Sequence, residues 1–207
     1  MNYRSLPRYA NSDLSEYRDL LFFGKAKAPS TPAQVFGTLF HDLVLEAKPP
    51  TGISTKMRAK LTAMQQAVFG NSTACEILSG AAVEQIQLWD DAKTGLPCKA
   101  KTDIVAPGGE LMGDLKTTSC RNYKEFLASC ERYAYDRQAA FYLDGNPGAS
   151  HFIFLGVQKQ APFDVFIFEA TAKPGYIEEG RKKYQALLRS IKKVGFVPSS
   201  WGQQTLQ

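Results

Sequence analysis

The chain has 207 residues, of which 44% are hydrophobic and 12% aromatic, a composition that excludes global disorder and is sufficient for one substantial core. Its net charge of +5 is compatible with a polyanionic partner but is too small to establish one. No apolar run approaches the roughly 18 residues that a membrane span needs, so we expect no membrane insertion.

The four cysteines stand at positions 75, 98, 120 and 130. Their spacing contains no CxxC pair and matches no zinc finger. The chain also starts without the apolar core of a secretory signal peptide. We therefore expect reduced thiols in a cytoplasmic protein.

The N-terminal part of the sequence carries helical patterns. Residues 11–23 begin with capping residues and place apolar side chains at helical spacing, so they predict a short helix. A proline-broken loop follows at 25–32, and residues 35–46, apolar all round, predict a buried helix. Residues 55–82 predict a helical stretch with an interruption around Gly70, and we assign no chemistry to it.

From Val83 onward, short alternating segments typical of β-strands appear, and the first three predict an antiparallel meander. The predicted strands are 83–90, 96–106, 111–118, 151–157 and 163–168, and the predicted helices are 121–143, as one or two helices, and 176–194. This order predicts an α/β protein of the α+β type, with helices beside a sheet that contains the meander.

Two carboxylates face each other across the second predicted hairpin. Gly108-Gly109 indicates a two-residue type I′ turn, in which directly opposed residues have numbers that sum to 217. Asp103 then lies opposite Asp114, and Lys116 points to the same face because strand side chains alternate. Two anions so close repel unless a cation lies between them, so the pattern favours a divalent metal.

Metal-assisted phosphodiester hydrolysis would use these residue types. Hard oxygen ligands hold Mg²⁺ or Mn²⁺, and Asp103, Asp114 and the carbonyl of Leu115 can supply them. Lys116 can orient water or stabilise the developing charge. The alternative is that both aspartates are separate exposed strand residues and Lys116 is a solvated partner, and the hairpin by itself leaves both interpretations open.

Two further residues extend this candidate site. If the turn around residues 93–94 pairs the first two strands with a sum near 187, Glu84 faces Asp103 and can bind an outer metal or its water. His41 lies on the apolar helix with Gly37 one turn earlier, and its imidazole can ligate a metal. The alternatives are a charge at a strand edge for Glu84 and a hydrogen-bonded core residue for His41.

Gln138 and Tyr142 lie four residues apart on one face of a predicted helix. Their amide and hydroxyl can contact a phosphate or a base. Tyr142 can equally be a core aromatic residue, so this pair does not discriminate between functions.

Taken together, these motifs resemble the RecB-type branch of the PD-(D/E)XK nuclease superfamily. The motifs, in chain order, are Gly37-x-x-x-His41, Glu84, Asp103, Asp114-Leu115-Lys116 and Gln138-x-x-x-Tyr142. Residues 36–46, 89–98 and 137–142 are most similar to the exonuclease domain of RecE-like phage recombination proteins. The resemblance runs from about residue 10 to the final helix, which implies a single exonuclease domain over residues 1–207.

The resemblance implies a mixed central sheet flanked by helices and Mg²⁺- or Mn²⁺-dependent digestion of linear double-stranded DNA from its ends. It also implies 5′ to 3′ polarity, 3′ overhangs passed to a single-strand annealing protein for recombination, and a ring-shaped homo-oligomer. The implied metal ligands are His41, Asp103, Asp114 and the Leu115 carbonyl; Lys116 is the catalytic lysine, Glu84 positions a second metal or its water, and Gln138 and Tyr142 organise the site.

The sequence departs from the family pattern at two positions. Thr102 replaces a proline, and this change is tolerable because proline is not a ligand. Asp114 replaces a glutamate, and either acid can chelate a metal. The cysteines lack the spacing of the iron-sulfur clusters found in some relatives, so we expect no such cluster. For a terminal 5′-phosphate, the candidate residues are Arg18, which offers a bidentate fork, and Lys25, for which surface solubility is the simpler explanation.

Three other functions remain open. A single-strand nuclease or an endonuclease of the same superfamily would share the fold and the metal chemistry. A catalytically inert DNA-binding module would be expected to have lost Asp103, Asp114 or Lys116, which are all present. A carboxylate-pair glycosidase is a weaker alternative, because Lys116 would have no role in its mechanism.

Overall fold

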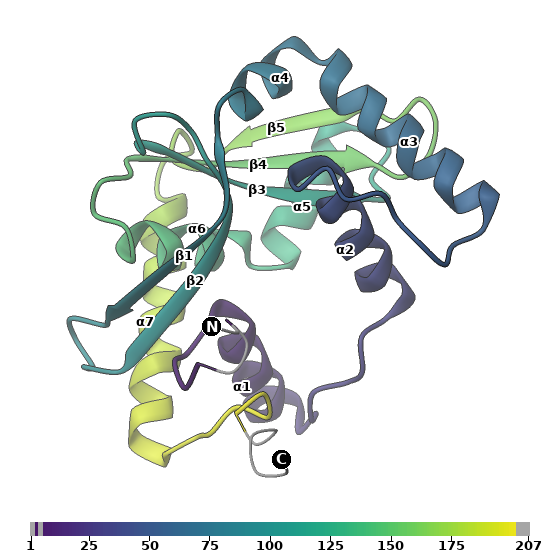
Figure 1. The fold of residues 1–207 in the computed structure, drawn as a ribbon. Helices are drawn as coiled ribbons and strands as arrows, with labels where there is room; N and C mark the ends of the chain where they lie inside the picture. Colours follow the sequence, from purple (N-terminus) through teal and green to yellow (C-terminus); the bar gives the residue numbers. More distant parts are fainter. Residues whose placement is uncertain (1–2, 4–5, 202–207) are drawn as a thin grey trace.

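The computed structural model describes residue 3 and residues 6–201, which fold around a mixed five-stranded sheet (Figure 1). The strands are β1 (Ala82–Asp90), β2 (Pro97–Val105), β3 (Leu111–Thr118), β4 (His151–Gln158) and β5 (Val165–Glu169), and the helices are α1 (Asn11–Phe23), α2 (Pro32–Leu45), α3 (Thr55–Gly70), α4 (Ser72–Leu78), α5 (Tyr123–Arg132), α6 (Tyr135–Asp144) and α7 (Tyr176–Val194). No helix among these residues combines the length and the apolar character that crossing a bilayer requires.

The strands lie side by side in their sequence order. β1, β2 and β3 form the predicted antiparallel meander, β4 runs parallel to β3, and β5 is antiparallel to β4. Parallel neighbours need a crossover connection, and α5 and α6 provide it between β3 and β4. The prediction of a mixed sheet with a meander and flanking helices is confirmed.

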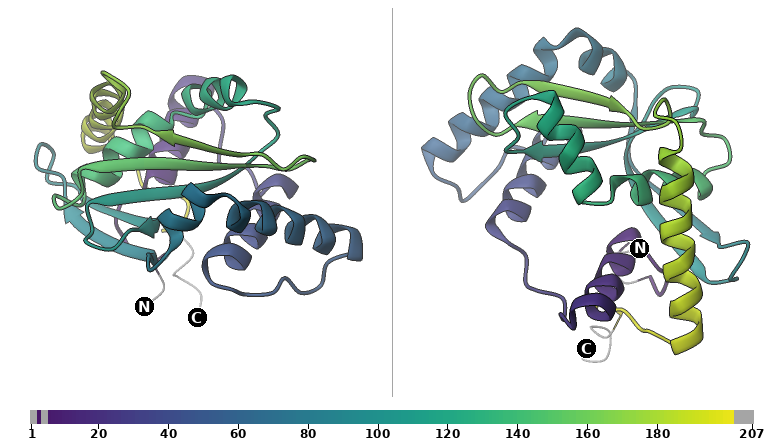
Figure 2. Two further views of the ribbon diagram at one scale, coloured as in Figure 1. Left: turned by 90° about the horizontal axis from the view of Figure 1, so that it is seen from above. Right: turned by 180° about the vertical axis from the view of Figure 1, so that it is seen from behind.

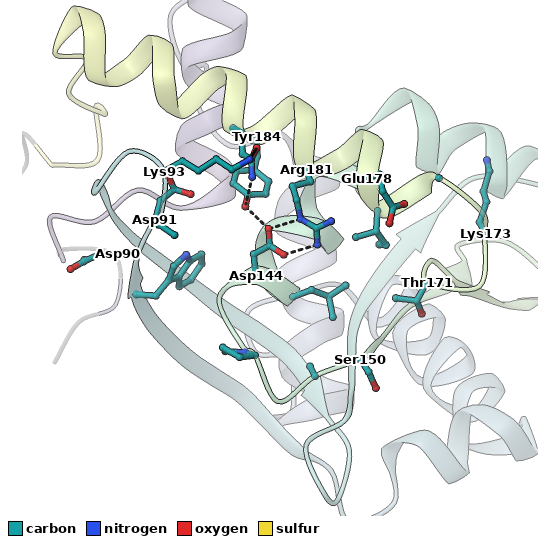
Figure 3. Close-up of a pocket in the computed structure, with 18 of the residues that line it drawn as sticks. Asp90, Asp91, Lys93, Asp144, Ser150, Thr171, Lys173, Glu178, Arg181 and Tyr184 are labelled. Atoms are coloured by element: carbon teal, nitrogen blue, oxygen red, sulfur yellow. Dashed lines mark hydrogen bonds and ion pairs between the residues drawn. The ribbon is translucent and has the colours of Figure 1, made fainter.

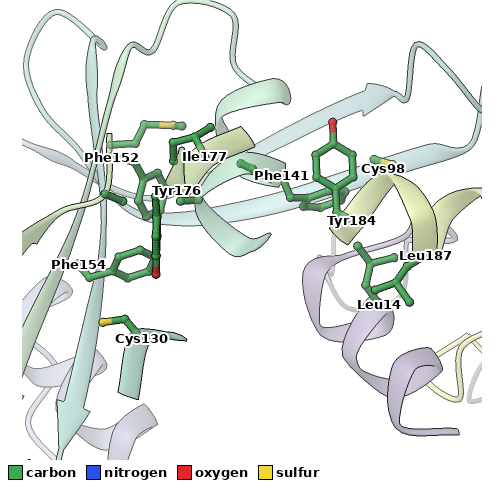
Figure 4. Packing of buried hydrophobic residues seen from close by; sticks show 14 of the residues in the cluster. Leu14, Cys98, Cys130, Phe141, Phe152, Phe154, Tyr176, Ile177, Tyr184 and Leu187 are labelled. Carbon is green, nitrogen blue, oxygen red and sulfur yellow. The ribbon is translucent and has the colours of Figure 1, made fainter. Parts of the chain in front are cut away.

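Helices cover both faces of the sheet (Figure 2). α2, α3 and α4 lie on one face, and α1, α5, α6 and α7 lie on the other. Side chains along β4 alternate accordingly: Phe152 and Phe154 pack toward α6 and α7, whereas Leu155 and Val157 pack toward α2 and α3. The aromatic core on the α7 side is the larger of the two (Figure 4).

Helix α2 differs from its prediction in start and in burial. Pro32 occupies the first turn after the capping residue Thr31, whose hydroxyl accepts a hydrogen bond from Gln34 N–H, so this proline begins the helix rather than breaking it. The expected complete burial was wrong, because Phe40 and Val44 are the buried residues of α2 and Val35 is 51% exposed.

Other boundaries shifted for local reasons. The stretch predicted over 55–82 ends at Leu78 and is divided into two helices by Asn71, whose side chain caps the second. Residues 121–143 form two helices separated by Ala134 in the left-handed region, at φ 53°. β5 starts at Val165, because Phe163 has φ 63° and cannot extend the strand. The helices predicted at 11–23 and 176–194 are confirmed.

The loop between β2 and β3 has five residues, 106–110, rather than the expected two-residue turn. Gly109 N–H donates to the carbonyl of Ala106 at 3.0 Å, and Ala106 N–H donates to Leu111 at 2.9 Å, so strand pairing closes outside both glycines. The predicted sum of 217 still holds, at the pairs Ile104–Gly113 and Val105–Met112. Beyond these pairs the strands diverge, and β1 and β2 curve away together from β3 (Figure 1).

Candidate metal centre and active site

Glu84 interrupts the pairing of β1 with β2. The register sums to 187 on both sides of it, as predicted, but Glu84 itself adopts φ 55° and forms no ladder pair with Asp103. A non-glycine residue in this region is sterically disfavoured, and such residues gather at functional sites. Ligand atoms of Glu84, Asp103 and His41 all lie within 4.8 Å of one another.

Asp103 is buried where β2 leaves β3. Its Oδ2 accepts a hydrogen bond of 2.9 Å from Leu115 N–H and lies 3.3 Å from His41 Nδ1. The Asp103 carboxylate thus accepts the hydrogen bond that a backbone carbonyl of a paired strand would otherwise accept from Leu115 N–H. Burial and the nearby charge of Asp114 raise the pKa of Asp103, and these effects outweigh the opposing influence of His41, Lys116 and Leu115 N–H.

Asp114 on β3 is held from two sides. The amide nitrogen of Gln138, on α6, donates a hydrogen bond to Oδ1, and Lys116 Nζ lies 2.5 Å from Oδ2. Oδ2 is buried and makes no hydrogen bond of good geometry with the described residues. The structure therefore leaves this oxygen with an ion-pair partner and with capacity for a further ligand.

Lys116 is a cation in this environment. Burial by itself lowers the pKa of the lysine, but the charge of Asp114, followed by Tyr135 and Asp103, raises it above its ordinary value. The ammonium also lies 5.0 Å from the centroid of the Tyr135 ring, a cation–π contact. A protonated lysine suits charge stabilisation and not proton abstraction.

Tyr142 lies one helical turn beyond Gln138, as predicted, and its ring packs edge-on against Phe152. Burial raises the pKa of its hydroxyl well above the ordinary value, and the charges of Asp114 and Asp103 add to the effect. The Tyr142 side chain therefore remains a neutral phenol that packs in the core beside the site.

The residues present fit a divalent cation. His41, Glu84 and Asp103 offer one nitrogen and two carboxylates, a donor set compatible with Mg²⁺ or Mn²⁺. Asp114 lies outside this group of three, although its charge reaches Asp103. The ligand roles of Asp114 and of the Leu115 carbonyl stay predictions.

The structure does not join Arg18 or Lys25 to these residues. Arg18 pairs with its neighbour Asp19 at 2.6 Å, and Lys25 Nζ lies 5.7 Å from the ring centroid of Phe23. Arg18 lies in the middle of α1, and Lys25 follows its C-cap residue Gly24. The contact of either residue with a 5′-phosphate also stays a prediction.

Sequence reasoning missed two residues that contact the site. Lys101 forms an ion pair with Glu84, and it lies two residues before Asp103 on the same strand, so strand alternation could have revealed it. Tyr135 precedes Gln138 by three residues and Tyr142 by seven, which is the spacing of one helix face.

Two cavities lie near the sheet. The first, of about 780 Å³, is lined by the end of β1 and the turn after it, by the loops that precede β4 and α7, and by α7; there Arg181 pairs with Asp144 at 2.7 Å, and Lys93 donates a hydrogen bond to Gln185 (Figure 3). The second, of about 680 Å³, is lined by His41 and Lys116. This second cavity opens onto the candidate active site.

Comparison with known proteins identifies the family of the chain. Residues 24–197 match the family described as a PDDEXK-like domain of unknown function (DUF3799). No curated protein sequence matches.

Two solved structures share the fold. A candidate exonuclease from Eubacterium rectale aligns with a TM-score of 0.68 at 14% identity, over 97% of this chain and 89% of that chain. A phage-related exonuclease from Haemophilus somnus aligns with a TM-score of 0.54 at 10% identity, over 88% of this chain and 81% of that one. The predicted superfamily and fold are confirmed, and the chain belongs to the PDDEXK-like family.

Proposed function

We propose that the chain is a metal-dependent deoxyribonuclease that hydrolyses phosphodiester bonds. The observation that carries this proposal is the convergence of His41, Glu84 and Asp103 within 4.8 Å, beside a buried ion pair of Asp114 and Lys116. Carboxylates and an imidazole can hold a divalent cation, and a fixed ammonium next to them suits an anionic substrate.

The chemistry assigned to the protein follows from these positions. A divalent cation in such a site lowers the pKa of a bound water and offsets phosphate charge. Lys116 donates hydrogen bonds to a non-bridging phosphate oxygen while the water oxygen bonds to phosphorus and loses a proton to solvent. The P–O bond to one sugar breaks, and the departing sugar oxygen takes up a proton from solvent. Gln138 fixes the orientation of Asp114, and Leu115 N–H fixes that of Asp103.

We further propose exonucleolytic action on linear double-stranded DNA with Mg²⁺ or Mn²⁺, from 5′ to 3′, leaving 3′ overhangs for a single-strand annealing protein. The support is the RecE-like pattern of motifs and the shared fold of two exonuclease structures. All four cysteines are free thiols, which is compatible with the proposed cytoplasmic location. Residues 1–207 would act as one nuclease domain.

A homo-oligomer, proposed as a ring, has one supporting feature. The last turn of α1 exposes four consecutive apolar residues: Leu20, Leu21, Phe22 and Phe23, between 45% and 67% exposed. Such a patch is unfavourable in water unless another surface covers it. Light scattering on wild type and on a Phe22→Ser, Phe23→Ser variant tests this: dissociation is expected, and an unchanged mass removes the patch from the interface.

One experiment tests the function. Linear duplex, circular duplex and linear single-stranded DNA are incubated separately with Mg²⁺, with and without EDTA, using wild type and Asp114→Ala. We expect degradation of the linear duplex but not of the circle, and its loss with either EDTA or the substitution. Nicking of the circle would establish an endonuclease instead, degradation confined to single-stranded DNA a single-strand nuclease, and binding without cleavage an inert DNA-binding module.

A further inference from the structure

The cavity beside Lys116 continues away from the metal centre as a groove. We define the groove by the 680 Å³ cavity. Thr117 and Thr118 at the end of β3 form part of its lining, together with Gly37 of α2 and Ser129 of α5. α2 borders the groove closely at Gly37, where an added Cβ would lie in ordinary contact, 3.7 Å from Thr117 Oγ1.

The groove carries unneutralised positive charge. Arg132, at the end of α5, and Lys159, just after β4, line it, and neither side chain forms an ion pair with the part of the chain that the structure describes. The acid in the lining, Glu125, is already paired with Arg121 at 2.9 Å. This balance contrasts with the first cavity, where Arg181 and Asp144 neutralise each other.

An exposed aromatic side chain lines the same groove as these cations. Tyr133 lines the groove and is 60% exposed, although a tyrosine ring gains free energy from burial. Its ring centroid lies 6.0 Å from that of Tyr135, at an angle of 31°. Tyr135 in turn contacts Lys116, so a continuous row of side chains leads from the ammonium to Tyr133.

The backbone holds this row in place. Ala134 adopts φ 53°, in the left-handed region, and separates α5 from α6. This residue lies between the two tyrosines, so Tyr133 ends up exposed at the groove while Tyr135 packs on Phe154 in the core, with ring centroids 4.8 Å apart. The backbone turn at Ala134 therefore leaves Tyr133 exposed beside Tyr135, whose own ring is packed in the core.

We propose that the groove binds an unpaired stretch of the DNA strand that enters the active site, with a base stacked on Tyr133 and phosphates on Arg132 and Lys159. Bases in single strands expose a π-face to aromatic side chains, whereas bases inside a duplex are covered on both faces. Cations that follow the backbone complete such a site. This inference rests on the proposed nuclease function, because the strand in the groove would be the substrate strand.

Binding in the absence of cleavage tests the proposal. Fluorescence anisotropy of labelled oligo(dT) in EDTA compares wild type with Tyr133→Ala, Tyr133→Phe and a matched control, Tyr123→Ala. Tyr123 is the first residue of α5, the helix that Tyr133 follows, and is 44% exposed, but it does not line the groove. We expect Tyr133→Ala to weaken binding about tenfold. Tyr133→Phe and Tyr123→Ala should bind like wild type.

The salt dependence gives a second readout. Removing both Arg132 and Lys159 should reduce the slope of log K against log salt by about 1.4, if each contacts one phosphate. Equal affinities of Tyr133→Ala and Tyr123→Ala, or an unchanged slope in the double variant, would overturn the inference. Circular dichroism confirms that each variant is folded.

The two proposals can fail separately. If wild type cleaves DNA but Tyr133 has no influence on oligo(dT) binding, the groove assignment is wrong and the nuclease stands. If oligo(dT) binding depends on Tyr133 but no DNA is cleaved with Mg²⁺ or Mn²⁺, the binding site stands and the nuclease function is wrong.

Discussion

The side-chain amide of Gln138 donates a hydrogen bond to Asp114 Oδ1 and thereby ties the middle of α6 to the middle of β3. Both residues are buried, at 6% and 3% exposure, so water cannot replace the amide. With Oδ1 engaged, Oδ2 is the oxygen that points to Lys116. Gln138 thus acts on the site through the orientation of a carboxylate.

Replacing Gln138 with alanine should therefore impair the site in two ways. The unsatisfied buried carboxylate should cost about 1–3 kcal/mol of unfolding free energy. Turnover should fall by about 10- to 100-fold, the usual effect of losing a residue that orients a ligand. Thermal unfolding and initial rates on linear DNA measure both. Gln185→Ala, which removes another buried glutamine at the remote cavity, is the control; an equal loss of rate in both variants would contradict the role of Gln138.

Lys116→Ala should separate turnover from metal binding. The ammonium stabilises charge that develops on the attacked phosphate, and loss of one such donor typically lowers the rate by about 10²–10³-fold. Metal affinity should stay the same or increase, because a neighbouring positive charge is removed. Steady-state rates and calorimetric titration with Mn²⁺ provide the two readouts. Lys93→Ala serves as the control, since Lys93 donates to Gln185 far from the metal centre. A large loss of Mn²⁺ affinity in Lys116→Ala would show that the lysine organises the ligands instead.

The stability of the metal-free protein should depend on the charge of Asp103. Burial and Asp114 raise the pKa of its carboxyl from 3.8 to about 6. The folded state then binds the proton more tightly than the unfolded state does, so this group lowers stability progressively as pH rises from about 4 to 6 and fully above that. Asp103→Asn keeps an acceptor for Leu115 N–H and removes the buried charge.

In EDTA at pH 7.5, we expect Asp103→Asn to unfold about 6–12 °C above wild type, and at pH 4 the difference should vanish. Excess Mg²⁺ should stabilise wild type alone, because metal binding to the native state requires the carboxylate. Thermal unfolding at the two pH values, with and without Mg²⁺, checks both statements. A lower unfolding temperature of the variant in EDTA at pH 7.5 would contradict the assigned cost of the charge.

The proposed 5′-phosphate contact predicts a selective defect. Arg18→Ala should raise the KM for 5′-phosphorylated duplex ends and leave the KM for 5′-hydroxyl ends unchanged, because the guanidinium would recognise the terminal phosphate alone. Lys25→Ala provides a parallel measurement at a more exposed cation. Competition between the two kinds of end for one enzyme gives the preference directly. If Arg18→Ala keeps the preference of wild type, Arg18 has no part in end recognition.

The strand registers could be predicted because the position of each turn fixes which residues of the two strands are opposed. The sums of 217 and 187 follow from where the turns lie, and both hold in the structure. Helices α1 and α7 were predicted with correct ends because apolar residues recur at helical spacing in both, and because Gly24, in the left-handed conformation, ends α1. N-cap side chains did not set their starts, since neither N-cap residue, Ala10 or Gly175, forms a side-chain cap hydrogen bond. In α2, by contrast, Pro32 satisfies two opposite rules, breaker and first-turn residue, and only the cap formed by Thr31 decides between them.

The divergence of β2 from β3 could not be predicted. Strand register places Asp103 opposite Asp114, but a local pattern does not reveal that the Asp103 carboxylate takes the hydrogen bond of Leu115 N–H. The left-handed backbone of Glu84 is equally hidden, because glutamate is not a residue that favours this conformation. Both features depend on tertiary contacts around the site.

The short pairing of β2 with β3 has a mechanical consequence. Glu84 and Asp103 are carried by the curved β1–β2 arm, which joins β3 at the pairs Ile104–Gly113 and Val105–Met112, whereas Asp114 belongs to a strand paired with β4 from Leu111 to Thr118. Glu84 and Asp103 therefore belong to the β1–β2 arm, whereas Asp114 belongs to the part of the sheet formed by β3 and β4. A cation held by both would cross-link them, so the angle of the arm sets the distance between the ligands. Substitutions near the Gly108–Gly109 loop can thus change activity by altering the angle of the β1–β2 arm, without contacting the ligands.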